Sequence, residues 1–201
     1  MLERVKTAVL VSGGGTNLAA LIAAGERGEM PSCELALCLS DRPDANALRR
    51  AEEAGIPTAV ADYKSSEDFD REVLDVLRTH DIEFVVHAGF LRVMGPAFCE
   101  AYAGRCINVH PALLPNFGGR GMYGLHVHRA VLDAGIKTTG ATVHYVSEVC
   151  DGGEIIAQKT VAVLPDDTPE TLQKRVMEQA EWVLLPKMTE NCCKRILRGR
   201  S

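Results

Sequence analysis

The sequence lacks an excess of positive charge and any long apolar run, and each absence excludes a class of protein. Its 201 residues carry a net charge of −5, which argues against a protein that holds nucleic acid by phosphate contacts. The basic cluster at Lys194, Arg195, Arg198 and Arg200 is expected to be a solvated tail. No apolar run approaches the length of a membrane span and no signal peptide is visible, so no membrane association is expected.

The sequence also lacks the cysteine and histidine spacings of disulfide frameworks and zinc sites. It has seven cysteines, an odd number, with no C-x-x-C pair, and we expect a reduced, cytoplasmic protein. His126 and His128 are two residues apart in a helical pattern, where their side chains diverge, and no neighbouring cysteine or carboxylate completes a ligand set with His110 or His144. No bound metal is expected.

Hydrophobic periodicity is present and predicts one α/β domain over residues 1–201. Buried strands are expected at 6–12, 34–40, 58–61, 83–88 and 105–110, with helices between them near 17–28, 45–54, 69–77 and 96. This alternation predicts a Rossmann-like, twisted, mostly parallel sheet with helices on both faces in a half spanning 1–110. In the second half, 111–201, a helix near 127–134 precedes two antiparallel strands at 139–146 and 154–164.

Capping residues mark two of the expected helices. Asp44 is the expected N-cap of the helix at 45–54, and Thr168 that of a closing helix with Pro169 in its first position. The spacing along the closing helix predicts a buried face formed by Leu172, Val176, Val183 and Leu184.

The stretch "SGGGTN" after the first strand is a candidate anion-binding loop. Its glycines can expose backbone N–H groups at a helix N-terminus, but it lacks the Lys of a Walker A loop, and Leu18 replaces the third glycine of a dinucleotide fingerprint. A glycine-rich turn that binds nothing is the alternative. Asp41, after the second strand, could bind a ribose, but a solvated turn is the favoured interpretation of "SDRPD".

The stretch "CINVHPALLP" places Asn108 and His110 on one face of a strand that Pro111 ends. The carboxyl ends of parallel strands are where open α/β sheets bind ligands. Asn can donate to a developing oxyanion, and His can carry a proton near neutral pH. Cys106 shares this face and is either a nucleophile or inert packing.

Asp151, before two glycines, is either a turn residue or a loop carboxylate that pairs with His110 and raises its pKa. The sequence lacks a G-x-S-x-G elbow, so a covalent acyl-enzyme has no obvious nucleophile. The anion loop, the Asn–His pair and the aspartate together favour direct attack by a substrate's own nucleophile on an activated carbonyl.

"INVHPALLP" resembles the signature of the folate-dependent formyltransferases. Joined to "VLVSGGGTNLAAL", "HAGFLRVM" and "GATVHYVSEVCDGGEII" in the same order, it resembles the branch of that family that acts on glycinamide ribonucleotide, over nearly the full length. The resemblance implies that a formyl group passes from 10-formyltetrahydrofolate to the amine of glycinamide ribonucleotide, a step of purine synthesis. These small molecules, rather than nucleic acid or a membrane, are the implied partners of a monomer or homodimer.

The resemblance also implies roles for particular residues. His110 would donate the proton, Asn108 would polarise the formyl oxygen and Asp151 would tune the histidine. The implied phosphate- and ribose-binding residues are Gly15, Thr16, Asn17 and Glu181. The implied folate-binding residues are Leu91, Arg92, Val93, Met94, Ser147, Glu148, Val149 and Cys150, together with Asn108, Asp151 and Lys64, which takes the place of an arginine that some relatives carry near Ser66.

Three alternatives remain open. A relative that formylates methionyl-tRNA has an added basic C-terminal domain, whereas this acidic chain ends soon after the closing helix. A relative that hydrolyses the formyl folate usually carries an extra domain before the first strand. A dinucleotide-binding module that is not an enzyme is the third. The loop at 116–125 is longer than in some relatives and is either a mobile lid or a plain surface loop.

Overall fold

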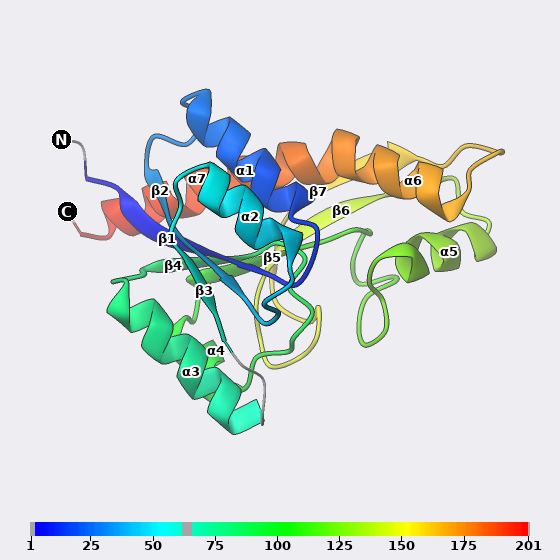
Figure 1. Cartoon of the computed structure of the whole chain (residues 1–201). Coiled ribbons are helices and arrows are strands. Elements are labelled where there is room, and N and C mark those ends of the chain that lie inside the picture. The colour runs from blue at the N-terminus through cyan, green and yellow to red at the C-terminus, as the bar shows by residue number, and fades with distance from the viewer. Residues whose placement is uncertain (1–2, 62–65, 201) are drawn as a thin grey trace.

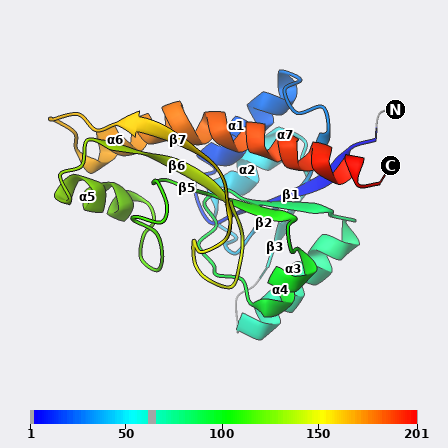
Figure 2. The same cartoon turned by 180° about the vertical axis from the view of Figure 1, so that it is seen from behind.

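A computed structural model describes residues 3–61 and 66–200, without the side chains of residues 66–68. Its centre is a seven-stranded sheet in the order β3-β2-β1-β4-β5-β6-β7 (Figures 1 and 2). The pairs among β1 to β5 are parallel, and β5–β6 and β6–β7 are antiparallel. The predicted mostly parallel α/β sheet with antiparallel strands in the second half is therefore confirmed.

Secondary structure follows the predicted alternation closely. The strands are β1 Val5–Val11, β2 Cys33–Ser40, β3 Thr58–Val60, β4 Phe84–His87, β5 Cys106–His110, β6 Thr138–Tyr145 and β7 Ile155–Ala162. The helices are α1 Thr16–Glu26, α2 Asn46–Glu53, α3 Ser66–Thr79, α4 Pro96–Ala101, α5 Leu125–Asp133, α6 Pro169–Val176, the π-helix η1 Met177–Glu181 and α7 Trp182–Arg198.

Two apolar cores lie on opposite faces of the sheet. The larger core joins alternate residues of β1, such as Val9 and Val11, to α1, α2, α6 and α7. The smaller core joins Ala8 and Leu10 to α3 and α4. Figure 1 shows α1, α2, α6 and α7 on one side of the sheet and α3 and α4 on the other. Because successive strand residues face opposite ways, both faces of the central strands must be apolar, and this explains their continuous hydrophobic runs.

The strand order reverses between β1 and β4. The chain builds β2 and β3 on one side of β1, then returns to add β4 and β5 on the other. The loops that leave the carboxyl ends of β1 and β4 therefore diverge, and such a switch point leaves a crevice for a ligand. Here the two loops remain tied together: the backbone N–H of Ser12 donates to the carbonyl of Gly89 (3.2 Å), and the N–H of Leu91 donates to the Ser12 hydroxyl (2.9 Å).

Two predictions about chain segments are wrong. Ala45, without a side-chain cap, precedes α2, and Asp44 pairs with Arg42 instead. The basic C-terminal cluster is not simply a solvated tail, because Arg195 donates to the Tyr145 hydroxyl and to the carbonyl of Gly104, and Arg200 pairs with Glu3. By contrast, Thr168 caps α6 as predicted, since its side chain accepts from the N–H of Thr171.

The predicted buried face of the closing helix is confirmed at three of its four positions. Leu172, Val176 and Leu184 are buried, but Val183 is 50% exposed. The π-helix η1 inserts an extra residue into the turn, and this rotates every later residue relative to a 3.6-residue repeat. The buried positions after η1 are instead Leu184, Leu185, Met188, Cys192 and Cys193. No helix in the described part of the chain is both long and apolar enough to cross a membrane.

Candidate active site

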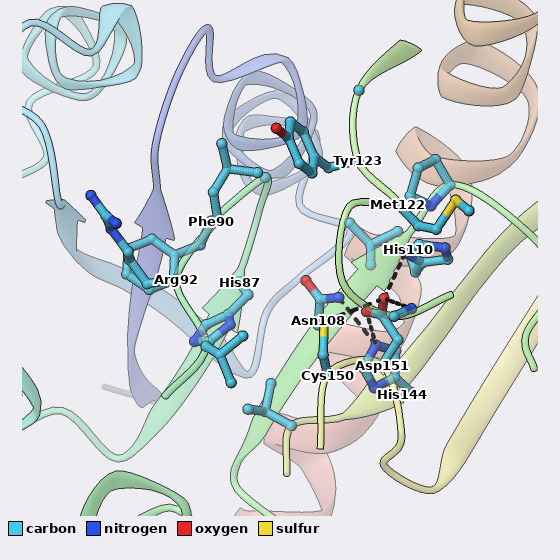
Figure 3. A pocket seen from close by; sticks show the side chains of 18 of the residues that line it. His87, Phe90, Arg92, Asn108, His110, Met122, Tyr123, His144, Cys150 and Asp151 are labelled. Atoms are coloured by element: carbon cyan, nitrogen blue, oxygen red, sulfur yellow. Dashed lines mark hydrogen bonds and ion pairs between the residues drawn. The ribbon is translucent and has the colours of Figure 1, made fainter. Parts of the chain in front are cut away.

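A cavity of about 450 Å³ opens at the carboxyl ends of β1, β4 and β5, where the strand order reverses. The long loop between β5 and α5 and the loop between β6 and β7 form its other walls (Figure 3). It brings together most of the residues predicted to form the site: Thr16, Asn17, Leu91, Arg92, Val93, Met94, Asn108, His110, Ser147, Val149, Cys150, Asp151 and Glu181. Segments far apart in the sequence therefore contribute to one site.

The turn between β1 and α1 forms one end of the cavity. Gly15 has φ +75°, and a Cβ there would lie 2.7 Å from Cβ of Ala47 on α2, so α2 fixes the shape of the turn. Arg50, also on α2, donates from Nε to the carbonyl of Gly14 (2.9 Å). Gly15 does not itself line the cavity, but Thr16 and Asn17, the first residues of α1, do. This helix N-terminus presents backbone N–H groups that suit an anion.

Glu181 faces the same end of the cavity from η1. Its carboxylate accepts from the Asn17 side-chain amide at 2.7 Å, and only 6% of the residue is exposed. Burial raises the pKa of Glu181 to about 7, partly opposed by the Asn17 amide. Oδ1 of Asn17 is buried without a hydrogen-bond partner among the described residues. The pair can therefore offer a carboxyl oxygen and an amide oxygen to hydroxyl groups of a ligand.

Asn108 lies at the middle of the cavity beside a histidine from the neighbouring antiparallel strand. Its register partner on β6 is His144, and Nδ2 of Asn108 lies 3.1 Å from Nε2 of His144. His144 Nδ1 donates to the carbonyl of Tyr145 (2.8 Å), and its Nε2 lies between the Asn108 amide and Oδ1 of Asp151. The second N–H of the Asn108 amide remains for a ligand oxygen.

His110 and Asp151 form a partly enclosed pair. His110 Nε2 donates to the carbonyl of Phe117 (2.7 Å), and Nδ1 lies 3.5 Å from Oδ2 of Asp151. Burial lowers the pKa of His110, and the Asp151 charge and the Phe117 carbonyl oppose that effect without overcoming it. Asp151 therefore raises the pKa of His110, as predicted. The desolvation of the ring lowers that pKa by more, so the net value lies below the ordinary one.

Asp151 contacts more than one histidine. Its Oδ1 lies 3.5 Å from Nε2 of His144, and its Oδ2 accepts from the backbone N–H of Gly119 (2.9 Å). Burial raises the pKa of Asp151, but His144, His110 and Gly119 together outweigh it and hold the pKa below its usual value. Asp151 has φ +54°, and a Cβ on Gly153 would collide with the Tyr145 carbonyl. The glycine lets the chain bend closely enough to aim the carboxylate inward.

Residues 91–94 form the opposite end of the cavity. Arg92 Nε donates to Oδ2 of Asp41 at 2.7 Å, and Asp41 is only 8% exposed. The interpretation of Asp41 as a solvated turn residue is therefore wrong: it anchors the loop after β4. Leu91 and Val93 are about half exposed, whereas Met94 is buried. This end of the cavity is apolar and can hold a flat ring.

Two of the predicted residues that the structure describes do not line the cavity. They are Gly15, in the β1–α1 turn, and Glu148, in the loop between β6 and β7, whereas Lys64 lies outside the described residues. Conversely, sequence reasoning missed the lining residues His87, Phe90, Arg120, His128, His144 and Met177. The register of β5 with β6 could have revealed His144, since it places that histidine opposite Asn108. Arg120 is a cation on the loop after β5 that no local pattern distinguishes from solvated arginines.

Metal binding has no support from the described side chains. In the ranges 3–61 and 66–200, no group of three histidine, cysteine, aspartate or glutamate residues is arranged to hold an ion. His126 points away from the cavity as an exposed residue, whereas His128 is buried.

Comparisons with known proteins point to one family. A family model described as "Formyl transferase" matches residues 5–188. The chloroplastic phosphoribosylglycinamide formyltransferase of Arabidopsis thaliana is 38% identical over 198 residues, covering 96% of this chain and 68% of that protein. A trifunctional purine biosynthetic protein of Gallus gallus is 43% identical over 88% of this chain, which spans 17% of that much longer protein.

A solved structure agrees with the sequence comparisons. The phosphoribosylglycinamide formyltransferase from Bacillus halodurans superposes with a TM-score of 0.85 and is 39% identical, with 92% of this chain and 94% of that chain covered. The chain therefore belongs to the formyl transferase family.

Proposed function

We propose that this protein transfers a formyl group from 10-formyltetrahydrofolate to the amine of glycinamide ribonucleotide, in the cytoplasm, as a monomer or homodimer of one 201-residue domain. The observation that carries the proposal is a single cavity with three kinds of surface in a row. Anion- and hydroxyl-binding groups lie at one end, a polar Asn–His–Asp set in the middle, and an apolar slot at the other end. Relatives named for the same activity support it.

The two ends of the cavity suit the two substrates. The N-terminus of α1, with Thr16 and Asn17, can bind the phosphate of the nucleotide, and Glu181 can accept hydrogen bonds from the ribose hydroxyls. Residues 91–94 and 147–151 can enclose the folate ring between apolar side chains and backbone groups. The reacting amine and formyl carbon would then meet beside Asn108 and His110.

The polar residues in the middle suit direct transfer. The amine nitrogen attacks the formyl carbon, a C–N bond forms, and the carbonyl oxygen gains negative charge. The second N–H of Asn108, and the Nε2–H of His110 once Phe117 gives it up, would stabilise that oxygen. As the bond between the formyl carbon and N10 of the folate breaks, the proton lost by the amine is delivered to N10, with His110 as carrier. Asp151 favours the charged form of that histidine.

The contact between His110 and Phe117 has a consequence for this mechanism. The Nε2–H of His110 donates to the Phe117 carbonyl. Substrate must take the place of that carbonyl or share the proton. Because Gly119 and Asp151 tie the same loop to the site, binding at His110 is coupled to the position of residues 116–125. We therefore propose that this loop also acts as a lid over the site.

The proposal is tested with one formyl donor and several acceptors. Purified protein is mixed with 10-formyltetrahydrofolate, and release of the unformylated folate is followed spectrophotometrically with glycinamide ribonucleotide, methionyl-tRNA or water as acceptor. We expect rapid transfer to the ribonucleotide, little or none to the tRNA, and slow release without an acceptor. Faster transfer to methionyl-tRNA, or equal release in water, would reject the proposed acceptor.

Removing the phosphate of the acceptor tests the binding end of the cavity. Contacts to a charged group each contribute about 1.5–3 kcal/mol, so the dephosphorylated nucleoside should lose several kcal/mol in kcat/KM. Equal reaction of nucleoside and nucleotide would show that the N-terminus of α1 is not the phosphate site.

A further inference from the structure

His87, the last residue of β4, lines the cavity although the proposed reaction assigns it no role. It is only 4% exposed, and its Nε2 is buried without a hydrogen-bond partner among the described residues. A buried polar atom without a partner is costly, and native proteins satisfy nearly all such atoms. An unpaired nitrogen in a ligand cavity therefore indicates a group that the ligand completes.

Strand register places His87 in a row of polar side chains. His87 is the register partner of Asn108 on β5, and Asn108 is that of His144 on β6. Register partners on adjacent strands lie about 4.8 Å apart and point to the same face. His87 thus lies one strand away from the asparagine proposed to meet the formyl oxygen, on the side opposite His144. In Figure 3, His87 lies across the cavity from His144 and Asp151.

Contacts with aromatic rings, rather than hydrogen bonds, hold the ring of His87 in position. The edge-to-face contact with Phe90 has a centroid distance of 5.0 Å, and Phe98 lies at 6.0 Å. Burial, with a smaller contribution from His144, lowers the pKa of His87 to about 3, so the ring is neutral at physiological pH. A neutral imidazole has one donor and one acceptor nitrogen and can match either kind of ligand atom.

We propose that His87 is a specificity-determining residue that hydrogen-bonds through its unpartnered ring nitrogen to a polar edge atom of the donor's fused pterin ring. The inference rests on the proposed function. The loop at residues 91–94 directly follows His87 and walls the apolar slot, so a flat ring in the slot has its edge near the imidazole. An apolar slot alone would hold any flat ring of that size, whereas a hydrogen-bonding group within it selects a ring with a polar edge.

The test compares His87→Leu, which removes the hydrogen bond, with His87→Gln, which keeps a donor and an acceptor. Binding of folic acid, which has the pterin ring but no formyl group, is measured by calorimetry. We expect His87→Leu to weaken binding about tenfold, equivalent to about 1.4 kcal/mol, and His87→Gln to retain most of the affinity. The KM for glycinamide ribonucleotide should stay within about twofold in both variants, because the α1 end of the cavity is unchanged.

Thr189→Val is a matched control. Thr189 on α7 also carries a buried hydroxyl without a partner among the described residues, but it does not line the cavity. This variant should bind folic acid as the wild type does. The melting temperature of the empty protein should be unchanged or higher in His87→Leu, because the substitution removes an unsatisfied polar group.

Nuclear magnetic resonance gives a readout that needs no variant. Adding folic acid to ¹⁵N-histidine-labelled protein should shift the His87 ring-nitrogen resonances, since a new hydrogen bond changes their shielding. The inference is overturned if those resonances do not move on saturation, if His87→Leu binds normally, or if His87→Gln loses as much affinity as His87→Leu. If the wild type neither binds folic acid nor transfers formyl groups, the proposed function itself fails.

Discussion

At the scale of single residues, Asn108 and His110 have different environments although they share a strand face. Asn108 keeps one N–H free, whereas both ring nitrogens of His110 have protein partners. The strand periodicity explains why they lie together, and the loops packed over them explain why only one of them is ready for a ligand.

Substitution of either residue should reduce the rate rather than the stability of the protein. Loss of a proton-transfer or oxyanion group typically lowers the rate about 10²–10⁴-fold, so we expect that loss of kcat in His110→Ala and Asn108→Ala. His126→Ala, at an exposed histidine outside the cavity, is the control and should retain activity. A folded His110→Ala variant with near wild-type kcat would remove His110 from the mechanism.

Asp151 should act on His110 through its charge. Burial already lowers the pKa of His110 and Asp151 opposes that effect, so Asp151→Asn should lower the pKa further. Titration of the His110 ring protons by NMR should show the change, and the inflection of the pH–rate profile that reports His110 should move to lower pH. An unchanged titration with an unchanged rate would mean that Asp151 serves only the turn.

Glu181 should make stability depend on pH with a definite sign. Its folded pKa of about 7 lies above the value of about 4.3 expected in an unfolded chain. Between these two values the folded state binds more protons, so the free energy of unfolding should fall as pH rises from about 4.5 to 7. Glu181→Gln removes this loss of stability, which is roughly 4 kcal/mol at most.

Urea unfolding at pH 5 and pH 8 checks this prediction. Glu181→Gln should match the wild type at pH 5 and exceed it at pH 8, and its KM for the ribonucleotide should rise. Glu178→Gln, which changes a side chain 46% exposed on the same π-helix and keeps Glu181, should show the same pH dependence as the wild type. Equal destabilisation by Glu181→Gln at both values would contradict a raised pKa.

At the scale of elements, the turn between β1 and α1 depends on the helix packed behind it. A Cβ on Gly15 would lie 2.7 Å from Ala47 and would sit at φ +75°, whereas a Cβ on Gly14 meets nothing within 4 Å. Gly15→Ala should therefore destabilise the protein by about 2–4 kcal/mol, from backbone strain and overpacking together.

Gly14→Ala is the matched control and should cost less than about 1 kcal/mol. Denaturant unfolding of both variants provides the comparison. If the two destabilise the protein equally, contact with α2 does not hold the turn in shape.

The π-helix is a second element whose effect extends beyond its own residues. It brings Glu181 into contact with Asn17 on α1 and shifts the buried face of α7. No spacing in the sequence marks this insertion, since Met177–Glu181 contains good helix formers throughout. It lies between α6 and α7 along the chain and packs against β6 and β7, so the position of Glu181 was predictable only as part of a helix and not as a side chain aimed into the cavity.

At the scale of the whole molecule, the electrostatic centre of the site consists of side chains from several strands and loops, and among the described residues no group of three histidine, cysteine, aspartate or glutamate side chains is arranged to hold a metal. Donors around the formyl oxygen can replace a Lewis acid in this reaction. Prolonged treatment with a chelator should therefore leave activity intact when it is removed before assay. Loss of activity that zinc restores would overturn the prediction, and metal analysis of the purified protein provides a second check.

The sequence by itself determined the α/β class, the order in which strands and helices follow one another along the chain, and the position of Asn108 and His110 at the end of a strand. These features follow from local rules: apolar runs, capping residues and the two-residue repeat of a strand act over short distances. The Thr168 cap and the antiparallel strands of the second half were predictable for the same reason.

Only the tertiary structure decided which residues meet. His144 reaches Asn108 through strand pairing, Asp41 is buried by Arg92, and His87 becomes a wall of the cavity because β4 lies between β1 and β5. The net pKa of His110 likewise depends on how completely distant loops exclude water from its ring. Burial and contact arise from the whole chain packing at once, and no local pattern in the sequence encodes them.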